Sequence, residues 1–224
     1  VTFNSGLGYY GWATPMNQTI VISANSLTND TGTYGQLTYT TNNSAITITG
    51  SGPSGPGNTV ILPGIIYGRP VTTLANYAFF GRTDLTNILI PGSVTNIGAY
   101  AFTWCSGLRA IDVDPANLFF SSTNGGLFNK DQTTLLQFPG GVGGNYAVPQ
   151  GVTRIGDYAF QLCKLSTITI PNSVTTIGNA EFYECDNLTT VYFQGDAPSI
   201  GVGAFGFDNN PTVYYLPGAS VWDA

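Results

Sequence analysis

The sequence predicts a repeat solenoid that is mainly β, with short helical turns in each repeat and a β-rich extension at its N-terminus. Internal periodicity is the first observation: a phenylalanine of one recurring motif returns at steps of 23, 58, 22 and 23 residues. The second is that each unit has only one apolar side, so neighbouring units must stack to bury it. The recurring phenylalanines are Phe79, Phe102, Phe160, Phe182 and Phe205.

Each unit begins with a strand of the form L-x-x-I-x-I, as in residues 85–90 and 188–193. Apolar and polar residues alternate there, which predicts a strand that buries one face. Pro91 and Pro171 follow two of these strands and are expected to end them, because proline cannot donate to the ladder.

A second short extended segment, S-V-T-x-I-G, comes next in each unit, and its glycine suits a turn that needs an unusual φ. The segment A-Y-A-F-x-x-C then places apolar residues three and four apart, which predicts one or two helical turns. The glycines concerned are Gly98, Gly156 and Gly178.

Three segments make up the 224 residues: a non-repeat extension or cap at 1–44, a solenoid at 45–217 and a C-terminal tail at 218–224. The units are 22–23 residues long, except for one longer unit at about 114–147 that contains a degenerate repeat. Arg82 and Asp208 replace the cysteine in the first and last repeats, as expected where terminal repeats cover the core.

These repeats resemble the BspA-like leucine-rich repeats of bacterial surface and secreted proteins. The resemblance rests on near-copies such as IPGSVTNIGAYAFTWCSGLRAIDV at 90–113 and IPNSVTTIGNAEFYECDNLTTVYF at 170–193, and it covers roughly residues 45–217. It implies a right-handed solenoid, an extracellular or cell-surface location in a bacterium, and a role in adhesion or protein binding. The family offers no catalytic residues to carry over.

Composition excludes several functions. Only 8% of the residues are charged and the net charge is −6, which is unsuited to nucleic acid or to an anionic membrane surface. No apolar run approaches the roughly 20 residues that span a bilayer. The sequence has no histidine, so Ser-His-Asp and Cys-His catalysis and imidazole metal sites are ruled out. We expect no enzyme activity and no cofactor.

The three cysteines all lie three residues after a repeat phenylalanine. One interpretation is a ladder of buried thiols that act as small apolar groups. A disulfide between Cys163 and Cys185 is an alternative, because these residues lie in adjacent repeats. A zinc or catalytic role is disfavoured, since the spacings of 58 and 22 residues form no zinc motif. The cysteines are Cys105, Cys163 and Cys185.

Acidic residues offer one enzymatic hypothesis. Asp112 and Asp114 flank Val113 on one side of a strand, roughly 7 Å apart, which overlaps the carboxylate spacing of inverting glycosidases. A solvated strand end explains the pair better, because nothing nearby raises either pKa. A weak calcium site at this pair, or at the cluster Glu181, Glu184 and Asp186, lacks the spacing of a known loop, so no metal site is predicted.

The outward positions of the stacked strands are the predicted binding face. Exposed leucine and tyrosine on such a ladder indicate an interface, although tyrosine and threonine are also good strand formers. The predicted binding row is Leu89, Asp112, Gln137, Thr169, Tyr192 and Tyr214. The row beside it is Asn87, Ala110, Leu135, Thr167, Thr190 and Thr212.

Two functions follow. The first is a non-enzymatic extracellular module of a bacterial surface or secreted protein, which binds a host, bacterial or matrix protein. The second is a structural subunit that assembles head to tail with copies of itself into a filament or surface layer through residues 1–44.

Overall fold

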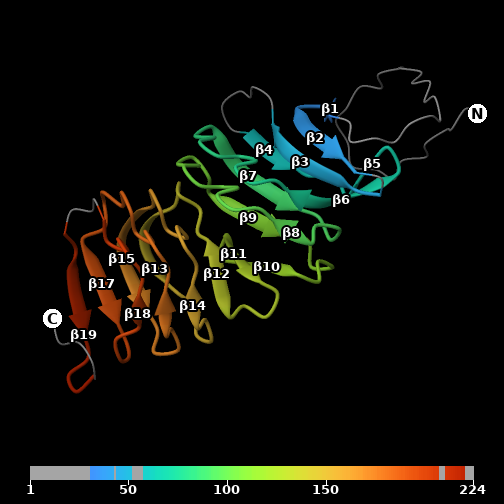
Figure 1. Ribbon diagram of the computed structural model, residues 1–224. Coiled ribbons are helices and arrows are strands. Elements are labelled where there is room, and N and C mark those ends of the chain that lie inside the picture. Colours follow the sequence, from blue (N-terminus) through green and yellow to red (C-terminus); the bar gives the residue numbers. More distant parts are fainter. Residues whose placement is uncertain (1–30, 43, 52–57, 207–209, 220–224) are drawn as a thin grey trace, which may run out of the picture.

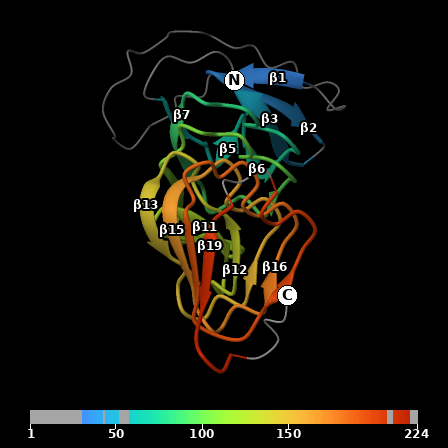
Figure 2. The same cartoon turned by 90° about the vertical axis from the view of Figure 1, so that its left-hand side faces the viewer.

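Parallel strands stack turn upon turn in the computed structural model (Figure 1). The structure describes residues 31–42, 44–51, 58–206 and 210–219. The described residues form nineteen strands and no helix. The strands wind into an elongated solenoid with the two described ends far apart (Figures 1 and 2). Most of the predicted 1–44 extension, and Asp208, lie outside the described residues.

The strands that begin each unit form a parallel ladder in two separate sheets. Equivalent core residues align in register, as Ile88 with Ile111 and Ile168 with Val191. The first sheet contains β4 (Asn58–Ile61), β7 (Leu85–Ile90) and β9 (Ala110–Val113). The second contains β13 (Gly143–Ala147), β15 (Lys164–Ile170), β17 (Thr190–Phe193) and β19 (Thr212–Tyr215).

The shorter strands form a second ladder, which is also interrupted. Its first sheet starts as an antiparallel meander and continues in parallel from β3 to β6 and β8. These strands are β1 (Thr31–Tyr34), β2 (Leu37–Thr41), β3 (Ile46–Ser51), β5 (Ile65–Ile66), β6 (Arg69–Leu74) and β8 (Asn96–Ile97).

The other sheet of this ladder starts with an antiparallel part in the long unit and continues in parallel. Its strands are β10 (Phe120–Thr123), β11 (Gly126–Asn129), β12 (Thr134–Gln137), β14 (Arg154–Ile155), β16 (Thr176–Ile177) and β18 (Ser199–Ile200). Strands β8 and β12 do not pair, so the long unit interrupts both ladders at the same level of the stack.

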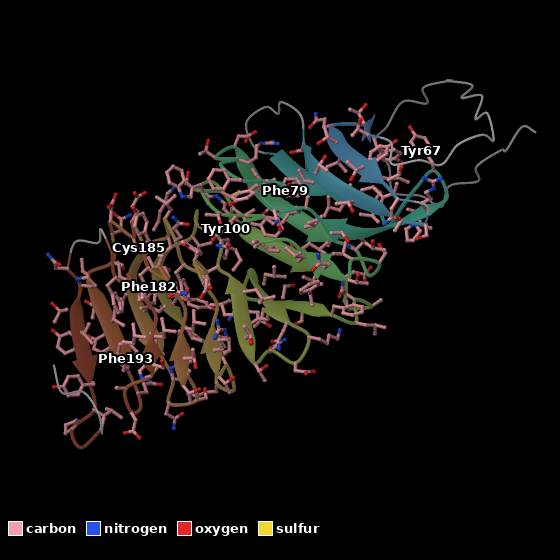
Figure 3. All side chains as sticks on the ribbon, viewed as in Figure 1. Tyr67, Phe79, Tyr100, Phe182, Cys185 and Phe193 are labelled. Atoms are coloured by element: carbon pink, nitrogen blue, oxygen red, sulfur yellow. The ribbon has the colours of Figure 1, made fainter. Side chains whose placement is uncertain are left out.

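Stacked phenylalanines run through the core on both sides of this break. Figure 3 labels Phe79 on one side and Phe182 on the other. The ring centroids of Phe79 and Phe102 are 5.8 Å apart, and those of Phe160 and Phe182 are 5.3 Å apart. Phe138 of the degenerate repeat packs against Phe160 with ring centroids 5.1 Å apart, and so occupies the same position in its own turn. Four of the five predicted phenylalanines are buried, and Phe205 in the last turn is half-buried.

The predicted helical turns at the A-Y-A-F corners are absent from the described residues. Each corner is a series of tight turns with a positive φ at the residue before the alanine, such as Tyr100 at 59° and Tyr158 at 60°. A helix would use its N–H groups internally, but here the N–H of Phe79 donates to the carbonyl of Ala101 in the next turn at 2.9 Å. The apolar spacing of three and four therefore reflects consecutive turns.

The glycine that recurs at the same place in these units has a different cause from the one predicted. Gly98, Gly156 and Gly178 do not have a positive φ. A Cβ at Gly98 would lie 2.4 Å from the backbone nitrogen of Asn76, and one at Gly178 would lie 2.6 Å from that of Asp157. Glycine is needed because successive turns approach closely at this point.

Candidate binding surfaces

The predicted outward row is present in two parts. Leu89 aligns with Asp112 in the first sheet, and Thr169 aligns with Tyr192 and Tyr214 in the second. The rings of Tyr192 and Tyr214 stack, with centroids 5.1 Å apart and planes at 21°. Their exposed fractions are 44% and 50%, so the pair presents a flat aromatic surface to solvent. We call Thr169, Tyr192 and Tyr214 the tyrosine face.

Gln137 does not belong to this row, and the prediction that placed it there was wrong. It lies on β12, which pairs in parallel with β14 through Leu135 and Ile155, so β12 belongs to the second ladder. Leu135, placed in the neighbouring row, is buried for the same reason. The positions next to Thr169 and Thr167 are occupied by Ala147 and Asn145. The sequence L-L-Q-F imitates the first strand of a repeat, which explains the misassignment.

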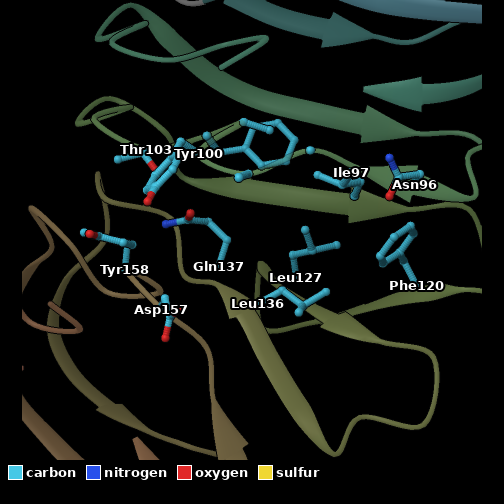
Figure 4. A pocket seen from close by; sticks show the side chains of 14 residues that line it. Asn96, Ile97, Tyr100, Thr103, Phe120, Leu127, Leu136, Gln137, Asp157 and Tyr158 are labelled. Atoms are coloured by element: carbon cyan, nitrogen blue, oxygen red, sulfur yellow. The ribbon is translucent and has the colours of Figure 1, made fainter. Parts of the chain in front are cut away.

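A crevice of about 390 Å³ opens where the ladders are interrupted (Figure 4). Tyr100 and Tyr158 lie at one end, and Asn96 and Phe120 lie at the other. Between them the walls carry the apolar side chains of Ile97, Leu127 and Leu136, together with Gln137. Gln137 is held there by hydrogen bonds from Nε2 to the carbonyls of Phe138 and Ala159, each 3.2 Å long.

Sequence reasoning missed the crevice, although a signal for it exists. Leu74 and Ile155 each precede the repeat phenylalanine by five residues, whereas Leu135 precedes Phe138 by three. Because Leu135 pairs with Ile155 and Phe138 packs against Phe160, the degenerate turn lacks two residues of its corner. The missing residues leave space beside the preceding turn.

Exposed aromatic side chains gather at the corners next to the crevice. Tyr77, Phe80 and Trp104 have exposed fractions of 55%, 43% and 44%. Tyr77 stacks on Tyr100 at 5.1 Å, and Phe80 stacks on Trp104 at 5.9 Å. The ring of Tyr100 also meets that of Tyr158 edge-on at 5.0 Å, and a hydrogen bond to Tyr158 raises the pKa of Tyr100.

The three cysteines are buried free thiols. Cys105 and Cys185 each donate to the carbonyl of a phenylalanine in the preceding turn at 3.0 Å. The Sγ atoms of Cys163 and Cys185 are 3.1 Å apart, so the two thiols are in contact and not bonded. Burial raises the pKa of Cys105 to about 12. These thiols therefore act as small apolar groups of the core.

The acidic residues do not form the sites considered for them. Asp112 is exposed, while Asp114 follows β9 and accepts a hydrogen bond from the N–H of Ala116 at 2.8 Å, which fixes a turn. Glu181 is fully buried, so it cannot join Glu184 and Asp186 in a surface calcium site. The described part of the chain contains no cluster of three or more Cys, Asp or Glu side chains placed to hold a metal ion.

The repeats and their stacking define a leucine-rich-repeat solenoid. The chain belongs to the family of BspA type leucine rich repeat regions, which matches in six copies over residues 58–142 and 144–219. Such repeats are generally protein-interaction modules and generally non-enzymatic. The resemblance predicted from the sequence is thereby confirmed.

Solved structures of bacterial leucine-rich repeat proteins are similar to this chain, and the first of the two described next shows the same fold. A leucine-rich repeat protein from Eubacterium ventriosum is 27% identical with a TM-score of 0.61; the match covers 72% of this chain but only 43% of that one. A leucine-rich repeat protein from T. pallidum is 25% identical with a TM-score of 0.45, over 79% of this chain and 88% of that one. No curated protein matches the sequence. Within the described residues, no helix has the length and apolar character needed to span a bilayer.

Proposed function

We propose that the chain is an extracellular protein-binding module of a bacterial surface or secreted protein, and that the tyrosine face docks its partner. The observation that carries this proposal is the exposed stack of Tyr192 and Tyr214. Aromatic side chains are enriched at interface hot spots because they bury a large area at a small cost in side-chain entropy.

The surroundings of the tyrosine face support the same function. Tyr215 and Leu216, immediately after Tyr214, are also more than half exposed. A small hollow of about 220 Å³ lies beside them, lined in part by Thr169, Tyr192 and Gln194. The polar residues Thr169 and Gln194 therefore lie next to the aromatic ring of Tyr192. This arrangement resembles the polar rim and apolar centre of protein interfaces.

The test compares capture of matrix and bacterial surface proteins by the immobilised chain and by two variants. The double variant Tyr192→Ala and Tyr214→Ala removes the stack, and loss of a hot-spot residue costs about 2 kcal/mol or more, or roughly thirtyfold in affinity. Tyr34→Ala is the matched control, because Tyr34 is 43% exposed on the distant strand β1. Equal capture by the wild-type chain, the double variant and Tyr34→Ala would show that the tyrosine face does not dock the partner.

A second candidate function, head-to-tail self-assembly, is favoured by strand β19. All four of its residues are exposed, and it pairs only with β17 among the described residues. Val213 is 38% exposed although its register partner Val191 is buried. A head-to-tail contact between the two ends of neighbouring solenoids, repeated without closing into a ring, produces a filament. Sedimentation velocity at rising concentration should then show growing species that Val213→Lys abolishes; a monomer at every concentration would exclude assembly.

A further inference from the structure

The corner turns carry a regular row of backbone hydrogen bonds from each turn to the next. The N–H groups of Tyr77 and Phe79 donate to the carbonyls of Ala99 and Ala101 at 3.0 and 2.9 Å. Beyond the crevice the pattern returns, and the N–H of Phe160 donates to the carbonyl of Glu181 at 3.1 Å. The acceptors lie two residues apart, as they do along an extended chain.

This row is interrupted at the crevice. Among the described residues no carbonyl accepts a hydrogen bond from the N–H of Tyr100 or Phe102, the equivalents of Tyr77 and Phe79. Both residues line the crevice. The degenerate turn has lost the two residues that would have completed its corner, and only Phe138 still donates onward, to Ala159 at 2.7 Å.

The strand ladder is open at the same level. Within the described part of the chain, strand β8 pairs with β6 alone, whereas the equivalent strands β14 and β16 each have a parallel neighbour on both sides. Asn96 and Ile97 of β8 border the same crevice. An unpaired strand edge is a template for a further extended segment.

We infer that the crevice binds an extended peptide segment of a partner protein, which replaces the missing corner of the degenerate turn. Carbonyls two residues apart on the peptide accept from Tyr100 and Phe102, a spacing that a sugar or a single carboxylate does not reproduce. One apolar side chain of the peptide packs between Ile97, Leu127 and Leu136. The inference shares the class of partner with the proposed function but no residue with the tyrosine face.

Size and charge agree with a short segment that carries no net charge. The volume of about 390 Å³ lies near the lower end of the roughly 300–1,000 Å³ found for ligand sites. Asp157 is the one carboxylic acid among the lining residues, and its Oδ1 already accepts from the N–H of Asn179 at 2.9 Å. Apolar and backbone contacts therefore dominate recognition.

The probe is a fluorescent ten-residue peptide, T-R-I-G-D-Y-A-F-Q-L, with the sequence of residues 153–162. This segment forms the regular corner that the degenerate turn lacks, and a scrambled peptide is its control. Fluorescence polarisation with the intact chain should show saturable binding of the first peptide alone. On binding, the amide protons of Tyr100 and Phe102 should exchange more slowly in NMR spectra, and those of Tyr77 and Phe79 should not change.

Two variants test the location. Leu136→Glu places a charge on a half-buried wall residue and should weaken binding about tenfold or more. Insertion of Asp-Tyr between Leu136 and Gln137 restores the regular spacing, fills the crevice and should abolish binding. Tyr192→Ala should leave peptide binding in the crevice unchanged. The experiment therefore distinguishes a failure of the crevice inference from a failure of the proposed docking at the tyrosine face. Equal affinity for the scrambled peptide, absence of saturable binding, or unchanged binding in both crevice variants would overturn the inference.

Discussion

Replacement of Glu181 by methionine is expected to stabilise the solenoid at neutral pH. Glu181 is fully buried at a position that alanine occupies in the neighbouring turns, and neither carboxyl oxygen has a hydrogen-bond partner among the residues that the structure describes. Burial raises its pKa well above the ordinary value of 4.5. The backbone N–H groups of Ala159 and Phe160 oppose this shift, but they do not reach hydrogen-bonding geometry with the carboxyl group.

The magnitude follows from the unpaired polar group. A buried group without a hydrogen-bond partner costs about 1–3 kcal/mol, and methionine keeps a similar length and volume without that cost. A carboxyl group lies at the upper end of that range, at about 2–3 kcal/mol, and a volume-conserving change costs about 1 kcal/mol, so the net gain should be about 1–2 kcal/mol. For a domain of this size that corresponds to a rise in Tm of roughly 2–8 °C.

The gain should depend on pH. The folded state holds the Glu181 proton more tightly than the unfolded chain, so wild-type stability falls as pH rises from about 4.5 towards the folded pKa. Urea unfolding of wild type and Glu181→Met at pH 4.5 and pH 7 should show a larger difference at pH 7. Glu184→Met removes the same charge from a half-exposed site and is the control. An equal or smaller gain at pH 7, or an equal gain in the control, would refute the reasoning.

Three further predictions concern the packing of the solenoid. Phe160→Ala should cost about 3–5 kcal/mol in chemical unfolding and Phe205→Ala clearly less, because Phe160 is fully buried and Phe205 lies half-buried in the last turn. In the folded protein Cys105 should react with a thiol reagent far more slowly than after unfolding, since its pKa is about 12; rapid labelling at pH 8 would contradict its burial. Gly98→Ala should lower Tm by several degrees, because the new Cβ meets the backbone nitrogen of Asn76.

The sequence predicted the repeat, its register and its core because periodic apolar positions leave one way to bury them. It predicted Phe79 and Cys185 as core residues, and both are buried. It mispredicted the corner, since a spacing of three and four does not distinguish a helix from consecutive turns.

The candidate site was harder to predict because it depends on which strand each segment joins. Tyr192 and Tyr214 follow from the regular repeats, and the structure places them together. Gln137 was misplaced because two strands of one unit share the same apolar alternation, and only pairing with Arg154 and Ile155 assigns β12 to its ladder. The crevice arises from two residues that are missing between Leu135 and Phe138, and this short spacing becomes visible only after β12 has been assigned to its ladder.

Amide hydrogen exchange of the intact chain tests the interruption of the solenoid most directly. Tyr77, Phe79 and Phe160 donate to carbonyls in the next turn, so their amide protons should exchange slowly. The amide protons of Tyr100 and Phe102, which lie in equivalent positions at the crevice, should exchange much faster. Equal protection of both sets would show that the hydrogen-bond row continues through the degenerate turn, and would contradict an open crevice at that place.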